Sequence, residues 1–192
     1  MKNKSGESGS FRTYGVFLRG INVGGVRIAM KDLQRVLTEA GFRQVETVLA
    51  SGNVVLRAET EDPGVVKQRV EASLRTAFGY DAWVIVKTPS ELATIVEGYP
   101  FTPADDGVPR HAYAVLTTGE DVVEQLLEDC PELSPEERAS PGGDVLYWEV
   151  PKGNTLESKL SKQMAKTMYK PVTTTRNLNT LHKVLARFRT GG

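Results

Sequence analysis

Short apolar runs and helical stripes alternate through the first half of the chain. Apolar residues at the i, i+3, i+4, i+7 spacing predict a helix over 30–40, and Pro63 opens a second helix. Apolar runs bounded by polar residues and glycines predict strands over 14–18, 45–50, 54–58 and 83–87. The resulting order, β-α-β-β-α-β, is that of a ferredoxin-like unit.

The second half repeats this pattern more loosely. Strands are predicted over 112–117, 138–140, 145–150 and 172–175, with helices over 120–129, 155–169 and 178–188. Between the halves come a short helix over 89–97 and a proline-rich linker. We therefore predict an α+β protein of two ferredoxin-like β-α-β-β-α-β subdomains with a C-terminal helix. The predicted bounds are a disordered leader over 1–12, a first subdomain over 13–98, a linker over 99–110 and a second subdomain over 111–192.

Composition narrows the class of protein. No apolar run in the 192 residues reaches the roughly 18 to 20 that a membrane span needs, so we expect no membrane partner. The single cysteine, Cys130, excludes an internal disulfide and fits a reducing compartment, and we expect a cytoplasmic protein. With two histidines the chain has too few ligands for a usual zinc site, and neither a metal nor a cofactor is predicted.

Charge is segregated along the chain although the net formal charge is zero. Residues 119–150 hold ten acidic side chains and one arginine, whereas 151–192 hold nine basic side chains and one glutamate. Lys159, Lys162, Lys166 and Lys170 are spaced to form one strip of the predicted helix over 155–169. This strip is interpreted as a solvated face, a surface for phosphate groups, or a partner of the acidic segment in the same chain or in a homodimer.

Two loops of the first half carry candidate ligand-binding residues. After the first strand come Arg19, Asn22, Gly24 and Gly25, where glycine backbone amides and a guanidinium could hold an anion. The loop is neither a P-loop nor a dinucleotide fingerprint, and its glycines could serve only the turn. Ser51 and Asn53 flank Gly52 in a predicted hairpin turn, which has the same two interpretations.

The segment 173–180 is dense in hydrogen-bonding groups. Thr175 or Asn177 could cap the last helix, and Arg176, at a junction of strand and helix, is the strongest candidate binder. No nucleophile motif is present, and His111 and His182 are interpreted as structural or surface residues. Whether the protein is an enzyme stays open.

Four blocks together resemble a known family. They are Phe17-Leu-Arg-Gly-Ile-Asn-Val-Gly-Gly25, Ala50-Ser-Gly-Asn-Val-Val55, Ser158-Lys-Leu160 and Thr174-Thr-Arg-Asn177. In this order they resemble the uncharacterised, mainly bacterial proteins called domain of unknown function 1697. The resemblance implies two ferredoxin-like subdomains and no established activity. The matched residues are Arg19, Asn22, Gly24, Gly25, Ser51, Asn53, Lys159, Arg176 and Asn177.

Three hypotheses for function follow. The first is a binding module in which Arg19, the Gly24-Gly25 loop, Lys159 and Arg176 converge on a phosphate of a nucleotide, a phosphorylated small molecule or a nucleic acid. The second is a small-molecule enzyme with a cleft between the subdomains. The third is a structural or interaction protein that pairs acidic and basic faces.

Overall fold

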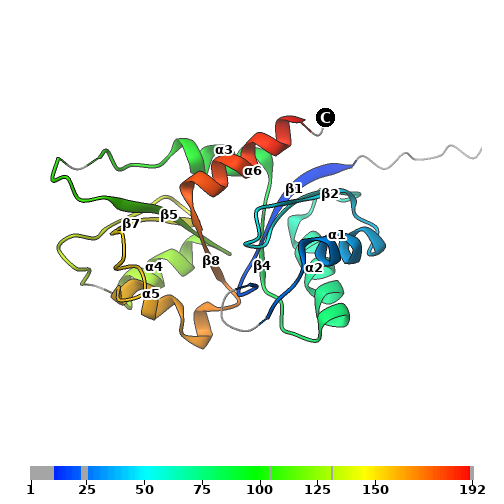
Figure 1. The fold of residues 1–192 in the computed structure, drawn as a ribbon, viewed down its shortest axis with the longest axis horizontal. Helices are drawn as coiled ribbons and strands as arrows, with labels where there is room; N and C mark the ends of the chain where they lie inside the picture. Colours follow the sequence, from blue (N-terminus) through cyan, green and yellow to red (C-terminus); the bar gives the residue numbers. More distant parts are fainter. Residues whose placement is uncertain (1–10, 23–25, 104, 131, 191–192) are drawn as a thin grey trace, which may run out of the picture.

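The computed structural model describes residues 11–22, 26–103, 105–130 and 132–190. Its first half is a β-α-β-β-α-β unit followed by one helix, here called the first unit (Figure 1). Its elements are β1 (Arg12–Leu18), α1 (Met30–Glu39), β2 (Arg43–Val48), β3 (Asn53–Ala58), α2 (Pro63–Phe78), β4 (Val84–Lys87) and α3 (Pro89–Glu97). Residue 12, expected in the leader, already belongs to β1.

The second half repeats this order and is here called the second unit. Its elements are β5 (Arg110–Thr117), α4 (Glu120–Glu128), β6 (Arg138–Pro141), β7 (Val145–Pro151), α5 (Lys159–Met164), the short 3₁₀ helix η1 (Thr167–Tyr169), β8 (Thr173–Asn177) and α6 (Leu178–Thr190). The α+β class and the repeated element order are as predicted. No helix in the described segments is long and apolar enough to cross a membrane.

The two units also share their strand order. The first forms an antiparallel sheet β2-β3-β1-β4, and the second forms an antiparallel sheet β6-β7-β5-β8. In each sheet the first strand of the unit lies between the third and the fourth. The last strands of the two units, β4 and β8, approach each other at the centre of the molecule (Figure 1).

Helices cover both faces of each sheet. Helices α1 and α2 pack on the outer face of the first sheet, and α4 with α5 on that of the second. Helices α3 and α6 pack against each other in the space between the sheets and share one apolar core with both inner faces (Figure 1). Since both faces are covered, β1 from Tyr14 onward and the whole of β7 are buried without alternation, although β7 includes Glu149.

The start of α3 is specified by local sequence. Thr88 accepts a hydrogen bond from the Glu91 amide, and the Glu91 carboxylate accepts one from the Thr88 amide, which completes a capping box. Pro89 occupies the first helical position, where no amide hydrogen is needed. The predicted helix over 89–97 is confirmed, and its apolar face lies in the core between the sheets.

The continuous helix predicted over 155–169 is wrong. Residues 159–164 form α5, Lys166 is extended (φ −62°, ψ 148°), and η1 follows. In a continuous helix the carbonyl of Met164 would accept from the amide of Met168. Here that carbonyl accepts instead from Arg19 Nη2 at 2.6 Å, so a tertiary contact replaces the helical one. As a result Met168 is 58% exposed, although helical spacing placed it on the apolar face.

Tyr80 has a buried hydroxyl without a hydrogen-bond partner among the described residues. Replacing Tyr80 with phenylalanine should raise the free energy of unfolding by about 1 kcal/mol at neutral pH, because an unpaired polar group leaves the interior. Burial also raises the pKa of Tyr80 to about 12. Above pH 10 the unfolded chain therefore loses the Tyr80 proton before the folded protein does. The free energy of unfolding of the wild type falls for this reason as the pH rises toward 12. Denaturant unfolding at pH 7 and pH 11 should show a larger advantage for the variant at pH 11; a variant less stable than the wild type at both would contradict this.

Candidate functional site

Arg176 points from β8 of the second unit into the hairpin of the first. Its side chain is buried, and all five of its N–H groups have acceptors. The hydrogen bonds are Nε to Asn53 Oδ1 at 2.5 Å, Nη1 to Thr174 Oγ1 and the Thr175 carbonyl, both at 2.8 Å, and Nη2 to the carbonyls of Leu18 at 2.5 Å and Gly52 at 3.3 Å. Three of these acceptors belong to the first unit, so Arg176 connects the two units.

Asn53 is held in the orientation that Arg176 requires. Its Nδ2 donates to the carbonyl of Val48 at 2.9 Å and to Ser51 Oγ at 3.0 Å, which turns Oδ1 toward the guanidinium. Asn53 is completely buried and is the first residue of β3, so the hairpin turn ends one residue earlier than predicted. The exposed Ser51 accepts from this amide, and Ser51 is not among the acceptors of Arg176 in the described residues.

Arg19 makes the reverse connection, from the end of β1 into the second unit. Its Nη1 donates to the carbonyl of Thr173 at 2.7 Å and to its Oγ1 at 2.6 Å, and its Nη2 donates to the carbonyl of Met164. Thr173 is itself fixed by a hydrogen bond from Oγ1 to the carbonyl of Tyr169 at 2.8 Å. The two arginines therefore cross the junction of the units in opposite directions; we call them the junction arginines.

The junction arginines are unusual in their charge balance. Among the described residues neither has an ion pair with an aspartate or a glutamate, and every acceptor just named is a neutral oxygen. Burial lowers the pKa of Arg19. Burial, and secondarily the nearby Arg19 charge, lowers the pKa of Arg176 to about 10. Two neighbouring cations are thus partly desolvated without a described carboxylate to offset them.

Gly52 allows the hairpin to approach this closely. Its φ of +72° lies in the left-handed region, and a β-carbon at this position would be 2.8 Å from Ile21 Cδ1. Its carbonyl accepts from the amide of Leu18 at 2.8 Å as well as from Arg176. Sequence reasoning treated Gly52 only as a turn residue and missed Thr173. The position of Gly52 between two candidate residues was the available signal for Gly52, and the run of three threonines was the signal for Thr173.

Asn22 closes the loop that follows Arg19. It has a left-handed φ of 58°, its Oδ1 accepts from the Ile28 amide at 3.0 Å, and its Nδ2 donates to the carbonyls of Ile28 and Ala50. Asn22 therefore ties this loop to the β2–β3 hairpin. The loop glycines Gly24 and Gly25 lie outside the described residues.

Lys159 and Asn177 are not brought to the junction arginines. Lys159 is exposed at the start of α5 and forms an ion pair with Glu132 at 3.4 Å. Asn177 Oδ1 accepts from the Asn179 amide at 3.0 Å and so caps the start of α6, as one interpretation predicted. Of the residues predicted to converge, Arg19 and Arg176 are neighbours, and Asn53 joins them through Arg176. Lys159 forms no hydrogen bond or ion pair with these three among the described residues.

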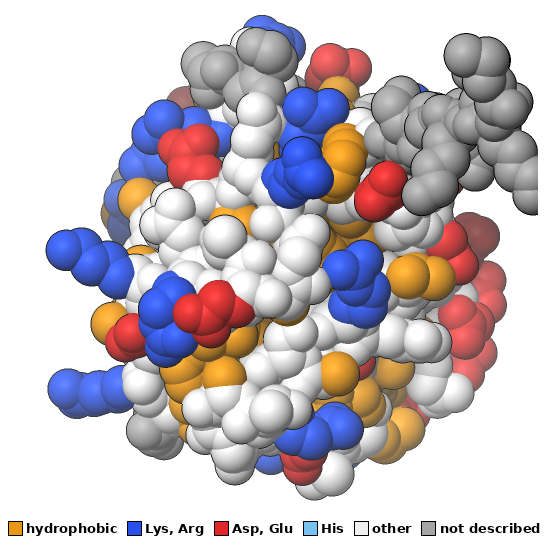
Figure 2. Space-filling view, turned by 90° about the vertical axis from the view of Figure 1, so that its right-hand side faces the viewer, with side chains coloured by type: hydrophobic (Ala, Val, Ile, Leu, Met, Phe, Trp, Pro, Cys, Tyr) orange, Lys and Arg blue, Asp and Glu red, His pale blue; other side chains and the backbone are white. Residues whose placement is uncertain are grey.

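The lysine strip is divided because its helix is divided. Lys159 and Lys162 lie on α5, Lys166 lies in the break, and Lys170 follows η1. The pair between Lys159 and Glu132 joins the acidic and basic segments within the chain. On the face of the molecule turned toward the reader in Figure 2, basic and acidic side chains are interspersed with neutral and apolar ones.

Residues 11–147 match the model of a family described as "Protein of unknown function (DUF1697)". The chain belongs to this family. The match includes Arg19, Gly52 and Asn53 and ends before the blocks around Lys159 and Arg176. No curated protein matches the chain in sequence.

Among solved structures, this DUF1697 chain is similar to the conserved bacterial protein SP0830 from Streptococcus pneumoniae. The TM-score is 0.71 at 22% identity, over 92% of this chain and 98% of that one. This likeness shows a shared fold across both units. An unknown protein from Galdieria sulphuraria also aligns, over 94% of this chain and 91% of that one, with 10% identity and a TM-score of only 0.28.

Proposed function

We propose that the protein binds an anion beside Arg19, and that this anion is a phosphate group of a nucleotide, a phosphorylated small molecule or a nucleic acid. The observation that carries the proposal is the pair of junction arginines, which repel each other and have no described acidic partner. A bound anion would offset both charges. In a site with little water such an interaction is stronger than at an exposed surface.

The two arginines would have different roles. Arg176 has an acceptor for each of its five N–H groups, so it has no free donor for the ligand. It would act as a positioning residue that holds the hairpin and adds positive charge near Arg19. Arg19 is half-buried, and its Nε and one Nη2 hydrogen have no acceptor among the described residues. These two donors would contact the ligand directly, since a guanidinium fork matches phosphate geometry.

Other positive groups lie in the same segments. Arg27, in the loop closed by Asn22, is exposed and forms no ion pair with any described residue. Lys166 and Lys170 lie in the segment between Met164 and Thr173 whose two ends accept from Arg19. A phosphate beside Arg19 would therefore bind at a place with a surplus of positive charge, and its affinity should fall with rising salt.

Neutralising Arg19 should weaken phosphate binding, whereas neutralising a lysine outside the junction should not. We expect pyrophosphate, ATP or a short single-stranded RNA to raise the melting temperature of the wild type, because binding to the native state stabilises it. Arg19→Gln should reduce the affinity about 10-fold or more, corresponding to about 1.4 kcal/mol. The matched control is Lys159→Gln, which removes one positive charge outside the junction and should leave binding unchanged. Titration calorimetry at two salt concentrations measures both.

Arg27→Gln separates binding from folding. Arg27 is exposed and forms no hydrogen bond or ion pair within the described part of the chain, so this variant should keep the wild-type melting temperature while binding pyrophosphate more weakly. If no anion in the series raises the melting temperature, or if the Arg19, Arg27 and Lys159 variants all bind as the wild type does, the proposal is wrong.

A further inference from the structure

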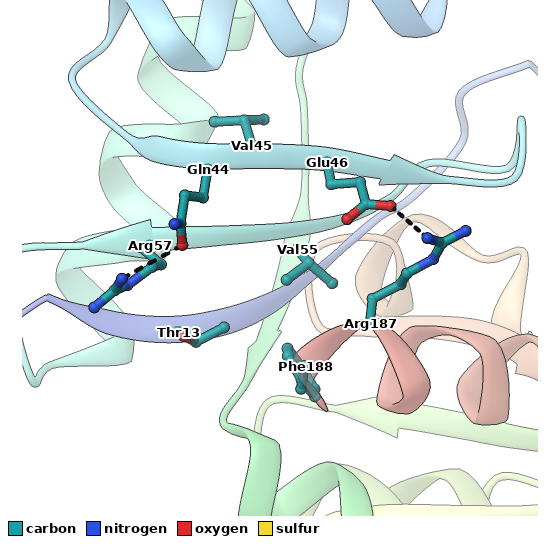
Figure 3. A pocket seen from close by; sticks show the side chains of 8 residues that line it. All are labelled: Thr13, Gln44, Val45, Glu46, Val55, Arg57, Arg187 and Phe188. Carbon is teal, nitrogen blue, oxygen red and sulfur yellow. Dashed lines mark hydrogen bonds and ion pairs between the residues drawn. The ribbon is translucent and has the colours of Figure 1, made fainter. Parts of the chain in front are cut away.

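A cavity of about 310 Å³ lies on the inner face of the first sheet where α6 ends (Figure 3). It is separate in its residues from the junction arginines. Three strands and one helix contribute to it. Its lining residues are Thr13, Gln44, Val45, Glu46, Val55, Arg57, Arg187 and Phe188.

The apolar part of the cavity is formed by Val55 and Phe188. A β-carbon on Gly15 would be 3.1 Å from Cζ of Phe188, so the glycine leaves room for this ring to lie on β1. Val55 projects from β3 beside it (Figure 3). The described part of α6 continues for two residues after Phe188, to Thr190.

Gln44 is held toward the cavity by strained backbone. Its φ of 47° is left-handed, which is uncommon for a residue with a long side chain. The strand register shifts between Arg43 and Glu46, so Gln44 lies at a β-bulge. Bulges and backbone strain of this kind occur frequently beside binding sites, where they direct a side chain. Here Gln44 and Arg57 point toward each other (Figure 3).

The guanidinium of Arg57 makes few and weak hydrogen bonds. Its Nη1 donates to Gln44 Oε1 at 3.4 Å and its Nη2 to the carbonyl of Phe11 at 3.3 Å, and both bonds are long. Its Nε is buried and has no hydrogen-bond partner among the described residues. Nor does any described acid form an ion pair with it, in contrast to Arg187, which pairs with Glu46 at 3.0 Å. Arg176, by comparison, has five acceptors.

We infer that this cavity binds a small organic monocarboxylate with an apolar body. The carboxylate would accept from Nη1 and Nη2 of Arg57, whose present hydrogen bonds are long, in an end-on fork. The body would lie on Val55 and Phe188. A doubly charged phosphate fits less well, because the carboxylate of Glu46 lines the same cavity. This inference does not depend on the proposed phosphate site, which uses other residues.

The test is an NMR titration of the full chain with benzoate, phenylacetate and isovalerate, each paired with its neutral amide. The acids should shift the backbone amides of Gln44, Val55, Arg57 and Phe188 in a saturable way, and the amides should not. Arg57→Met should weaken binding at least 10-fold, whereas Arg57→Lys, which keeps the charge, should lose less. Arg43→Met is the matched control, since Arg43 neighbours Gln44 but stacks on Phe11 outside the cavity lining.

Several results would overturn the inference. They are no binding by any of the three acids, equal binding of an acid and its amide, and unchanged affinity in Arg57→Met. Shifts at Arg19 or Arg176 with none at Arg57 would place the acids at the junction arginines instead. The backbone spectrum of each variant reports whether it is folded, so a folding defect is distinguished from lost binding.

Discussion

Arg176→Met should lower the free energy of unfolding by about 3 kcal/mol, because it leaves buried acceptors without their donor. Asn53 Oδ1 and the carbonyl of Leu18 lie closest to the lost N–H groups, at 2.5 Å each. Methionine has similar length and no charge, so its apolar stem fills the space while the hydrogen bonds are lost. Chemical denaturation of the full chain, with the slope m checked for constancy, measures the change.

Two further variants define what the Arg176 result means. Arg35→Met removes an arginine exposed on α1, where its ion pairs with Asp32 and Glu39 lie at the surface, and should change stability by less than about 0.5 kcal/mol. The double variant Arg176→Met with Asn53→Leu removes donor and acceptor together and should recover part of the loss. If Arg176→Met is as stable as the wild type, this prediction is wrong. The stabilisation by the hydrogen bonds of Arg176 would then be no larger than the free energy that burial of its charge costs.

Gly52→Ala should destabilise the protein by about 3 kcal/mol for two reasons that a control can separate. The left-handed φ of +72° costs an alanine about 1 kcal/mol. The added β-carbon would also be 2.8 Å from Ile21 and 3.0 Å from the β-carbon of Leu18, and such overpacking costs roughly 1 to 3 kcal/mol more.

Gly143→Ala is the matched control. Gly143 has the same φ of +72° in the β6–β7 turn, and a β-carbon there would meet nothing within 4 Å. Gly143→Ala should lower the free energy of unfolding only by the cost of the left-handed backbone conformation, about 1 kcal/mol. The difference between the two variants in denaturant unfolding therefore measures the close approach of the hairpin to β1. Equal losses in both variants would show that the hairpin accommodates the extra carbon.

Elements formed by local signals were predicted well from the sequence. The segment from Pro89 to Glu97 predicts α3, and the apolar run of β1 predicts a strand. Helix α5 shows where local signals fail. Helical spacing continues through Met168, but Arg19, 145 residues away, takes the carbonyl of Met164, and this contact has no signal in the local sequence.

The candidate site was predicted in part for the same reason. The loop of Arg19, the hairpin of Asn53 and the strand of Arg176 were each selected as polar segments among apolar ones, and the structure brings these three together. The sequence could not indicate that Arg176 points inward to Asn53, 123 residues away, with every donor satisfied. Nor could it indicate the cavity at Arg57, since the bulge at Gln44 depends on the pairing of β2 with β3.

The most direct measurement of the proposed function is an NMR titration of the arginine side-chain Nε–H signals with pyrophosphate. If the anion binds beside Arg19, the Arg19 Nε–H signal should shift in a saturable and salt-dependent way. The Arg176 Nε–H signal should move little, because it already donates to Asn53. An Arg19 signal that does not move, in a sample whose other signals show a folded chain, would contradict the proposal.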